Sequence, residues 1–299
     1  MTLERGNLFE PQLVSDLIDK VEGKSSLVAL SQSRPIPFNG QKEFIFTMDN
    51  DIDVVAESGA KSHGGVSLEP VTIIPIKVEY GARVSDEFIY ASEEEKINII
   101  KSFNDGYAKK LARGLDLMAM HGVNPRTGSA SAVIGNNHFD NLVTQTVDFN
   151  QADPDVNIEE AVSLVQAANG AVSGMAMAPV FSSALANYKV NGVKQFPELA
   201  WGGNPGSVNG LPIDVNSTVS EGSDDVAILG DFQNMFKWGY AKHIPFEVIR
   251  YGDPDNSGND LKGHNQVYLR SETYLGWGIM DGTNFARVID TGAGGGVEG

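Results

Sequence analysis

The sequence contains no cysteine and no long hydrophobic run, and each absence excludes a class of protein. Without cysteine the chain can form neither disulfides nor thiolate metal or redox sites, which is compatible with a reducing compartment. No segment approaches the 18 or more apolar residues of a membrane-spanning helix. The first 12 residues, MTLERGNLFEPQ, also lack the basic and apolar regions of a signal peptide. We therefore expect a soluble protein with no membrane contact.

Positive charge is also scarce. The chain has 22 Lys and Arg against 39 Asp and Glu, a formal net charge of −17 at pH 7. Tight general binding of nucleic acid needs clustered Lys and Arg on the phosphates. Any contact with double-stranded DNA should therefore be weak or indirect.

The 299 residues are enough for two compact domains, or for one domain with large insertions. Glycine is abundant, at 33 residues, and helix and strand patterns are mixed along the chain. This mixture predicts the α+β class.

The strongest single pattern predicts one long helix from Ser92 to His121. Ser92 is a good N-cap, and Glu95 three residues later completes a capping box. The helix would be about 45 Å long, which is unusual for a compact domain and typical of a rod that joins separate parts. Its apolar residues recur at the three-four spacing of one helical face: Ile97, Ile100, Phe103, Tyr107, Leu111, Leu115 and Met118.

Two weaker elements precede this helix. Residues 1–37 are predicted to form an N-terminal arm, with a helix at Pro11–Val21 followed by SLVAL, because so few apolar residues cannot form a core. Residues 38–84 are predicted to form a long hairpin, with strands KEFIFTM and VTIIPIKVEYGARV and the polar tip DIDVVAESGAKSHGGVSLEP. A two-stranded hairpin is marginal in water, so we expect it to rest on another molecule.

After the long helix, residues 155–232 are predicted to form a small α/β unit that begins with a helix at 157–170. Residues 233–290 are strand-rich, with the runs MFKWGYA, PFEVIRY, NQVYLRSETYLGWGIM and FARVI. The last stretch, 291–299, is flexible by composition.

No catalytic or metal-binding constellation stands out, so we expect no cofactor and no metal. The five histidines lack the i, i+4 spacing of a zinc helix: His63, His121, His138, His243 and His264. The segment GDPDNSGND distantly resembles a calcium loop but lacks the final bidentate Glu. A hydrolase that uses Ser62 and His63 with an unidentified acid is a distant alternative.

The order of these parts resembles the major capsid proteins of tailed bacteriophages, which have the HK97-like capsid fold. The resemblance covers nearly the whole chain, and its order and spacing are more specific than any one piece. The matching segments are VVAESGAKS, RVSDEFI, LDLMAMHG, NPRTG, NGLPIDVNSTV, GDFQNMFKWGY and NQVYLRSETYLGWGIMDGTNFARVI.

By this resemblance, 38–84 is an extended E-loop, and 155–232 is an axial A domain. Residues 85–154 and 233–290 together form the peripheral P domain with its spine helix. The function implied is a major capsid protein that self-assembles into hexamers and pentamers of an icosahedral phage head enclosing double-stranded DNA. The cellular shell proteins called encapsulins, which enclose cargo proteins, are the alternative.

The resemblance also implies partners and a location. Scaffolding is expected from a separate protein, because the arm here starts almost at Met1, and a portal and decoration proteins are further expected partners. The protein would be found in the virion capsid after assembly in the host cytoplasm.

In part of this family a lysine of the E-loop forms an isopeptide bond with an asparagine of a neighbouring P domain, assisted by a glutamate. The matching residues here are Lys61, Asn265 and Glu272. Lys61 must lose its proton before it can attack, with Glu272 as the base. The alternative is an ion pair between Lys61 and Glu272 across the subunit contact.

Overall fold

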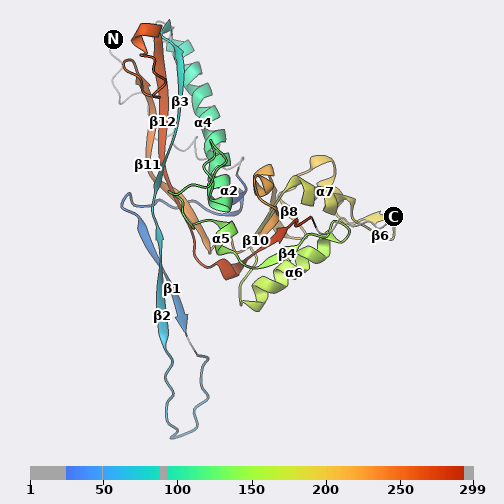
Figure 1. Ribbon diagram of the computed structural model, residues 1–299. Helices are drawn as coiled ribbons and strands as arrows, with labels where there is room; N and C mark the ends of the chain where they lie inside the picture. Colours follow the sequence, from blue (N-terminus) through green and yellow to red (C-terminus); the bar gives the residue numbers. More distant parts are fainter. Residues whose placement is uncertain (1–24, 49, 88–92, 293–299) are drawn as a thin grey trace.

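The computed structural model describes residues 25–48, 50–87 and 93–292. The molecule has three parts (Figure 1). A long three-stranded sheet lies along one long helix, a six-stranded sheet with two helices lies to one side, and a two-stranded hairpin extends away from both. The predicted Pro11–Val21 helix and the Ser92 cap lie outside the described residues.

The long helix is α4, Glu93–His121, so the prediction of a single helix is confirmed. It packs on the sheet formed by β11 (Phe236–Ile249), β12 (Gln266–Ile279) and β3 (Ile76–Ser85), in that order. From Ile100 onward the predicted apolar stripe faces this sheet. Ile100 and Phe103 are partly buried and pack against a small separate core. The rest of the stripe is buried in the main core, with Tyr107, Leu111, Leu115 and Met118.

The six-stranded sheet is mixed, with the strand order β4-β13-β10-β5-β9-β8. Helices α6, Pro154–Ala167, and α7, Pro179–Asn187, contact it and share a buried core with it. The strands are β4 Thr146–Asp148, β5 Gly174–Met177, β8 Ser207–Val208, β9 Leu211–Val215, β10 Asp225–Gly230 and β13 Phe285–Ile289.

Strand β13, the FARVI run, does not lie beside β11 and β12. After β12 the chain turns at 281–284 and enters the six-stranded sheet between β4 and β10. Asp281 caps this turn by accepting a hydrogen bond from Thr283 N at 2.9 Å. Gly282 is needed there, because a Cβ atom would come within 2.1 Å of the Leu142 carbonyl oxygen.

The hairpin consists of β1, Gln41–Met48, and β2, Val66–Ile73, in antiparallel register from Gln41 opposite Ile73 to Met48 opposite Val66. The prediction of one continuous return strand was wrong. The strand stops at Ile73, and after Ile74 and Pro75 the chain continues as β3 in the long sheet. Proline cannot donate a ladder hydrogen bond, which favours a break there.

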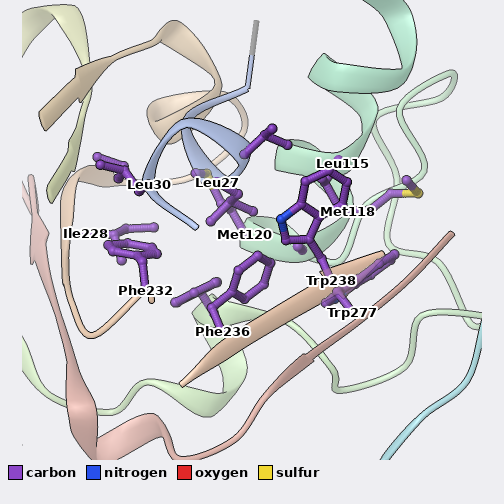
Figure 2. Close-up of a cluster of buried hydrophobic side chains, with 14 of the residues drawn as sticks. Leu27, Leu30, Leu115, Met118, Met120, Ile228, Phe232, Phe236, Trp238 and Trp277 are labelled. Atoms are coloured by element: carbon purple, nitrogen blue, oxygen red, sulfur yellow. The ribbon is translucent and has the colours of Figure 1, made fainter. Parts of the chain in front are cut away.

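The described end of the N-terminal segment is buried. Helix α2, Ser26–Leu30, inserts Leu27 and Leu30 between α4 and the six-stranded sheet (Figure 2). The side chains around it come from α4, β10, β11 and β12: Leu115, Met118, Met120, Ile228, Phe236, Trp238 and Trp277, with Phe232 from the segment between β10 and β11. Residues 33–36 then pair with β11, where Arg34 N donates to the Trp238 carbonyl oxygen at 2.9 Å.

A buried carboxylate on α4 holds this junction together. Asp116 is fully buried and accepts hydrogen bonds from Ser25 Oγ and from the amides of Ser26 and Leu27, at 3.0 and 3.3 Å. It also accepts one from Thr218 Oγ1 at 2.8 Å, in the short 3-10 helix η2, Ser217–Ser220. Burial raises the pKa of Asp116 to about 6, although these hydrogen bonds favour the charged form.

We expect Asp116→Ala to destabilise the subunit by about 2 to 4 kcal/mol, because it leaves several buried donors without an acceptor. Urea unfolding of unassembled subunits measures this change. Asp224→Ala is the control, because Asp224 is exposed and its substitution should change stability by less than about 0.5 kcal/mol. Equal stability of Asp116→Ala and the wild type would contradict the role given to Asp116.

The raised pKa of Asp116 also predicts a pH dependence. Its folded value of about 6 lies above the ordinary 3.8, so the folded chain binds this proton more tightly. Its contribution to the free energy of unfolding is therefore greatest below pH 4 and falls, by about 3 kcal/mol in all, as the pH rises through 6. Asp116→Asn cannot titrate, so the stability difference between wild type and variant should shrink over this window. A difference that stays constant from pH 4 to 7 would contradict the prediction.

Candidate functional site

The loop that joins β1 to β2 carries Lys61 and is exposed along its described length, 50–65. Ile52 and Val54 are 98% and 94% exposed, so no other part of the chain that the structure describes covers these apolar side chains. Lys61 itself is exposed. Ser62 and His63 share this exposed loop, and among the described residues no carboxylate bonds to His63. The hydrolase alternative therefore has no assembled acid and base here.

One face of the hairpin is apolar, and none of the described residues covers it. The register sets Phe44 opposite Pro70 and Met48 opposite Val66, with Leu68 between them on the same face. Phe44, Met48, Val66 and Leu68 are 60 to 69% exposed. The other face differs, because Ile73 is buried against Ile36 and Met280 at the base of the hairpin. The exposed face is thus available to another molecule.

Asn265 lies at the opposite end of the long sheet, just before β12. It ends the short 3-10 helix Lys262–His264 in a left-handed conformation, with φ 53° and ψ 48°. Its carbonyl oxygen accepts a hydrogen bond from Asp86 N at 2.9 Å, and its side chain is exposed. Asparagine tolerates this conformation better than most residues.

The loop leading to Asn265 is organised around an arginine. Arg83 of β3 reaches into the GDPDNSGND segment and contacts Asp253 at 2.6 Å, Asp255 at 2.5 Å and the Asn259 carbonyl oxygen at 2.9 Å. The hydrogen bond from Arg83 holds the pKa of Asp255 well below its usual range. The guanidinium occupies the centre that a cation would need, so the weak resemblance to a calcium loop does not describe this segment.

Glu272 lies in the middle of β12, paired across the sheet with Glu79 and Ile244. It is 7% exposed and contacts Lys77 Nζ at 2.6 Å and Arg270 Nε at 3.4 Å. Burial alone would raise the pKa of Glu272, but Lys77 and Arg270 lower it below its ordinary value. A carboxylate held in this way is a weak base.

One chain does not bring the three predicted residues together. The loop with Lys61 is at one end of the molecule, and the start of β12, next to Asn265, is at the other (Figure 1). Glu272 is seven residues from Asn265 along an extended strand, a separation of about 23 Å. Any reaction among these three positions therefore needs more than one subunit.

A cluster that the sequence analysis missed lies at the end of α4. His121, Asp140 and Asp225 come from three elements, and one nitrogen or oxygen atom from each side chain lies within 4.8 Å of the other two. His121 Nδ1 is 2.9 Å from Asp140 Oδ2 and its Nε2 is 2.9 Å from the Thr218 carbonyl oxygen, so both ring nitrogens face acceptors. Arg287 bonds to both carboxylates, at 3.3 and 3.1 Å.

Among the described residues, the His121 cluster has side chains that could bind a metal ion. Its carboxylates are already paired with His121 and Arg287. Burial would lower the pKa of His121, but Asp140 raises it above its usual value, which favours the charged imidazolium. Burial and the neighbouring Asp140 raise the pKa of Asp225 to about 7. We interpret the cluster as an ion network that joins α4 to the six-stranded sheet. Spacing in the sequence could not reveal the cluster, because His121 and Asp225 are 104 positions apart.

Among the described helices, none combines the length and the apolar character needed to cross a bilayer.

Comparison with known proteins identifies the family. The sequence model of the phage capsid family matches residues 5–288 of this chain. A solved structure from Mycobacterium phage Ogopogo is similar to this chain with a TM-score of 0.76 and 31% identity, over 90% of this chain and 92% of that one. A structure from Gordonia phage Cozz has a TM-score of 0.74 and 24% identity, over 89% and 87%.

A more distant structure, titled the capsid of a native GTA particle, shares the fold with a TM-score of 0.62 and 14% identity, over 89% of each chain. No curated protein matches the chain. Nothing in these comparisons favours an encapsulin or a hydrolase, and the phage capsid family is structural rather than enzymatic. The chain therefore belongs to the phage capsid family and is a major capsid protein of the HK97-like fold, a component of the virion capsid.

Proposed function

We propose that the hairpin of one subunit binds the surface of its neighbours and so builds the closed head around double-stranded DNA, in hexamers and pentamers. The observation that carries this proposal is the uncovered apolar face of Phe44, Met48, Val66 and Leu68. Large exposed apolar patches are rare on monomers and mark interaction surfaces. The hairpin is then the E-loop, and the sheet with α4 and the six-stranded sheet form the main parts of the P and A domains.

Further partners belong to the same proposal. A scaffolding protein, a portal and decoration proteins assist or complete the shell, which assembles in the host cytoplasm. Packaged DNA touches the inner wall only weakly, because the net charge of −17 disfavours phosphate contacts.

We expect Phe44→Ser combined with Leu68→Ser to abolish shells while the subunit stays folded. Both side chains are at least 60% exposed, so their loss removes contacts with neighbours rather than with the chain's own core. Light scattering and electron microscopy measure assembly, and urea unfolding of the free subunit measures folding. Val133→Ser, at a 76% exposed position outside the hairpin, is the matched control. Normal shells from the double variant would contradict the proposal.

We also propose a covalent bond between Lys61 of one subunit and Asn265 of another. The neutral Lys61 amine attacks the side-chain carbonyl carbon of Asn265, a new amide forms and ammonia leaves. Exposure of both side chains supports this pairing. Glu272 assists only if a third subunit contributes it, since about 23 Å separate it from Asn265 of its own chain. Its ion pairs with Lys77 and Arg270 would also have to loosen before it could accept a proton.

Mature wild-type particles boiled in SDS should therefore give ladders or material that fails to enter the gel. Lys61→Arg should restore one band near 32.1 kDa, because a guanidinium keeps the charge but cannot form this amide. Asn265→Gly should do the same, since glycine accepts the φ of 53° without strain. A single monomer band from mature wild-type particles would exclude the bond and leave an ion pair at Lys61.

A further inference from the structure

A small hairpin carries two lysines side by side, at the end of the six-stranded unit that lies far from α4 (Figure 1). Strands β6, Lys189–Val190, and β7, Val193–Lys194, pair so that Lys189 lies directly opposite Lys194. The turn between them is Asn191-Gly192, and both residues have positive φ, as a tight two-residue hairpin requires. We call this element the lysine hairpin, residues 189–194.

The lysine hairpin makes few side-chain contacts with the described part of its chain, among them a hydrogen bond from Lys194 Nζ to Asn187 Oδ1 at 3.4 Å. It forms a separate two-stranded sheet, and such a sheet is marginal in water. Like charges opposite each other are unfavourable, yet neither lysine forms an ion pair with any residue that the structure describes. Val190 and Val193, on the other face, are 44% and 64% exposed. These features are typical of an element whose partner is another molecule.

The distribution of charge along the chain makes these two lysines exceptional. Between Arg126 and Lys237 they are the only Lys or Arg residues, while the same stretch contains twelve Asp and Glu. When several copies of this acidic unit approach one another, they repel unless the few cations lie at the contact.

A groove on the same unit has the complementary charge. It lies between the edge strand β4 and helix α6, has a volume of about 660 Å³, and contains the carboxylates of Asp148, Asp155, Glu159 and Glu160. Val156, which is 46% exposed, adds an apolar contact. None of the four carboxylates is ion-paired within the described chain, although Asp155 interacts with the side chain of Tyr188. We call this feature the acidic groove.

We propose that the lysine hairpin of one subunit binds the acidic groove of the adjacent subunit in the shell. The face that carries the two lysines meets four carboxylates, so the charges of the two surfaces match. Because hairpin and groove are different surfaces, the contact is heterologous, and it can repeat around a ring until the ring closes. This inference rests on the self-association of the capsid protein and adds the residues that direct it.

A charge exchange tests the pairing. Lys189→Glu with Lys194→Glu should raise the concentration needed for assembly at least tenfold, and so should Glu159→Lys with Glu160→Lys. The chain that carries all four substitutions should regain assembly to within about threefold of the wild type, because the reversed charges attract again. Light scattering over a protein dilution series measures these concentrations, and circular dichroism checks that each subunit is folded.

The matched control places the same new charges outside the groove. Glu198→Lys with Asp224→Lys changes the net charge equally at two exposed positions of the same unit. These substitutions should not rescue Lys189→Glu with Lys194→Glu. Equal rescue by the control would overturn the proposal in favour of a simple net-charge effect, and folded groove variants that fail to rescue would overturn it as well.

A carbodiimide, which joins amines to carboxylates in direct contact, gives an independent readout. Shells built from equal amounts of ¹⁵N-labelled and unlabelled wild-type subunits should yield peptides that join Lys189 or Lys194 to groove carboxylates with mixed labelling. If intact shells yield no such mixed-label peptides, the inference is overturned, while self-assembly itself still stands. Failure of the wild type to form shells when its scaffolding protein is supplied would instead overturn the proposed function.

Discussion

The buried carboxylate of Asp116 is the contact on which the junction between the two sheets depends. It caps the start of α2 through the Ser26 and Leu27 amides and also binds Thr218 of η2, so one side chain of α4 joins the N-terminal segment to the six-stranded sheet. One turn further along α4, His121 binds the Thr218 carbonyl oxygen and Asp140. A buried charge is costly unless it is fully hydrogen-bonded. The hydrogen bonds of Asp116 and His121 therefore fix how α4, the N-terminal segment and the six-stranded sheet are arranged relative to one another.

This stable junction contrasts with the elements that extend from it. The β1–β2 hairpin and the lysine hairpin are both two-stranded, and both expose apolar side chains. There is a physical reason for a shell subunit to combine a stable core with exposed hairpins. Its core must fold before assembly, while the surfaces that join subunits gain their stability only when a neighbour covers them.

The Arg83 cluster lies near the surface, but its own contacts hold it in place, as those of Asp116 hold the junction. Arg83 binds Asp253, Asp255 and Ser257, and this fixes the loop that presents Asn265 at the end of the long sheet. A guanidinium suits this role better than an ammonium because it has several donors in a fixed plane. The strongly negative chain thus uses its few cations where carboxylates would otherwise repel one another, at Arg83, at Arg287 and on Lys77 beside Glu272.

Local patterns were enough to predict the long helix, most strands and the α+β class, because helical periodicity and turn residues are properties of neighbouring positions. The family was suggested by the resemblance of several segments, in the same order, to those of known capsid proteins. Sequence alone could not assign FARVI to the six-stranded sheet, break the return strand at Pro75, or bring His121, Asp140, Asp225 and Arg287 together. Strand partners and buried ion clusters depend on contacts between residues far apart in the chain, so only the tertiary structure decided them.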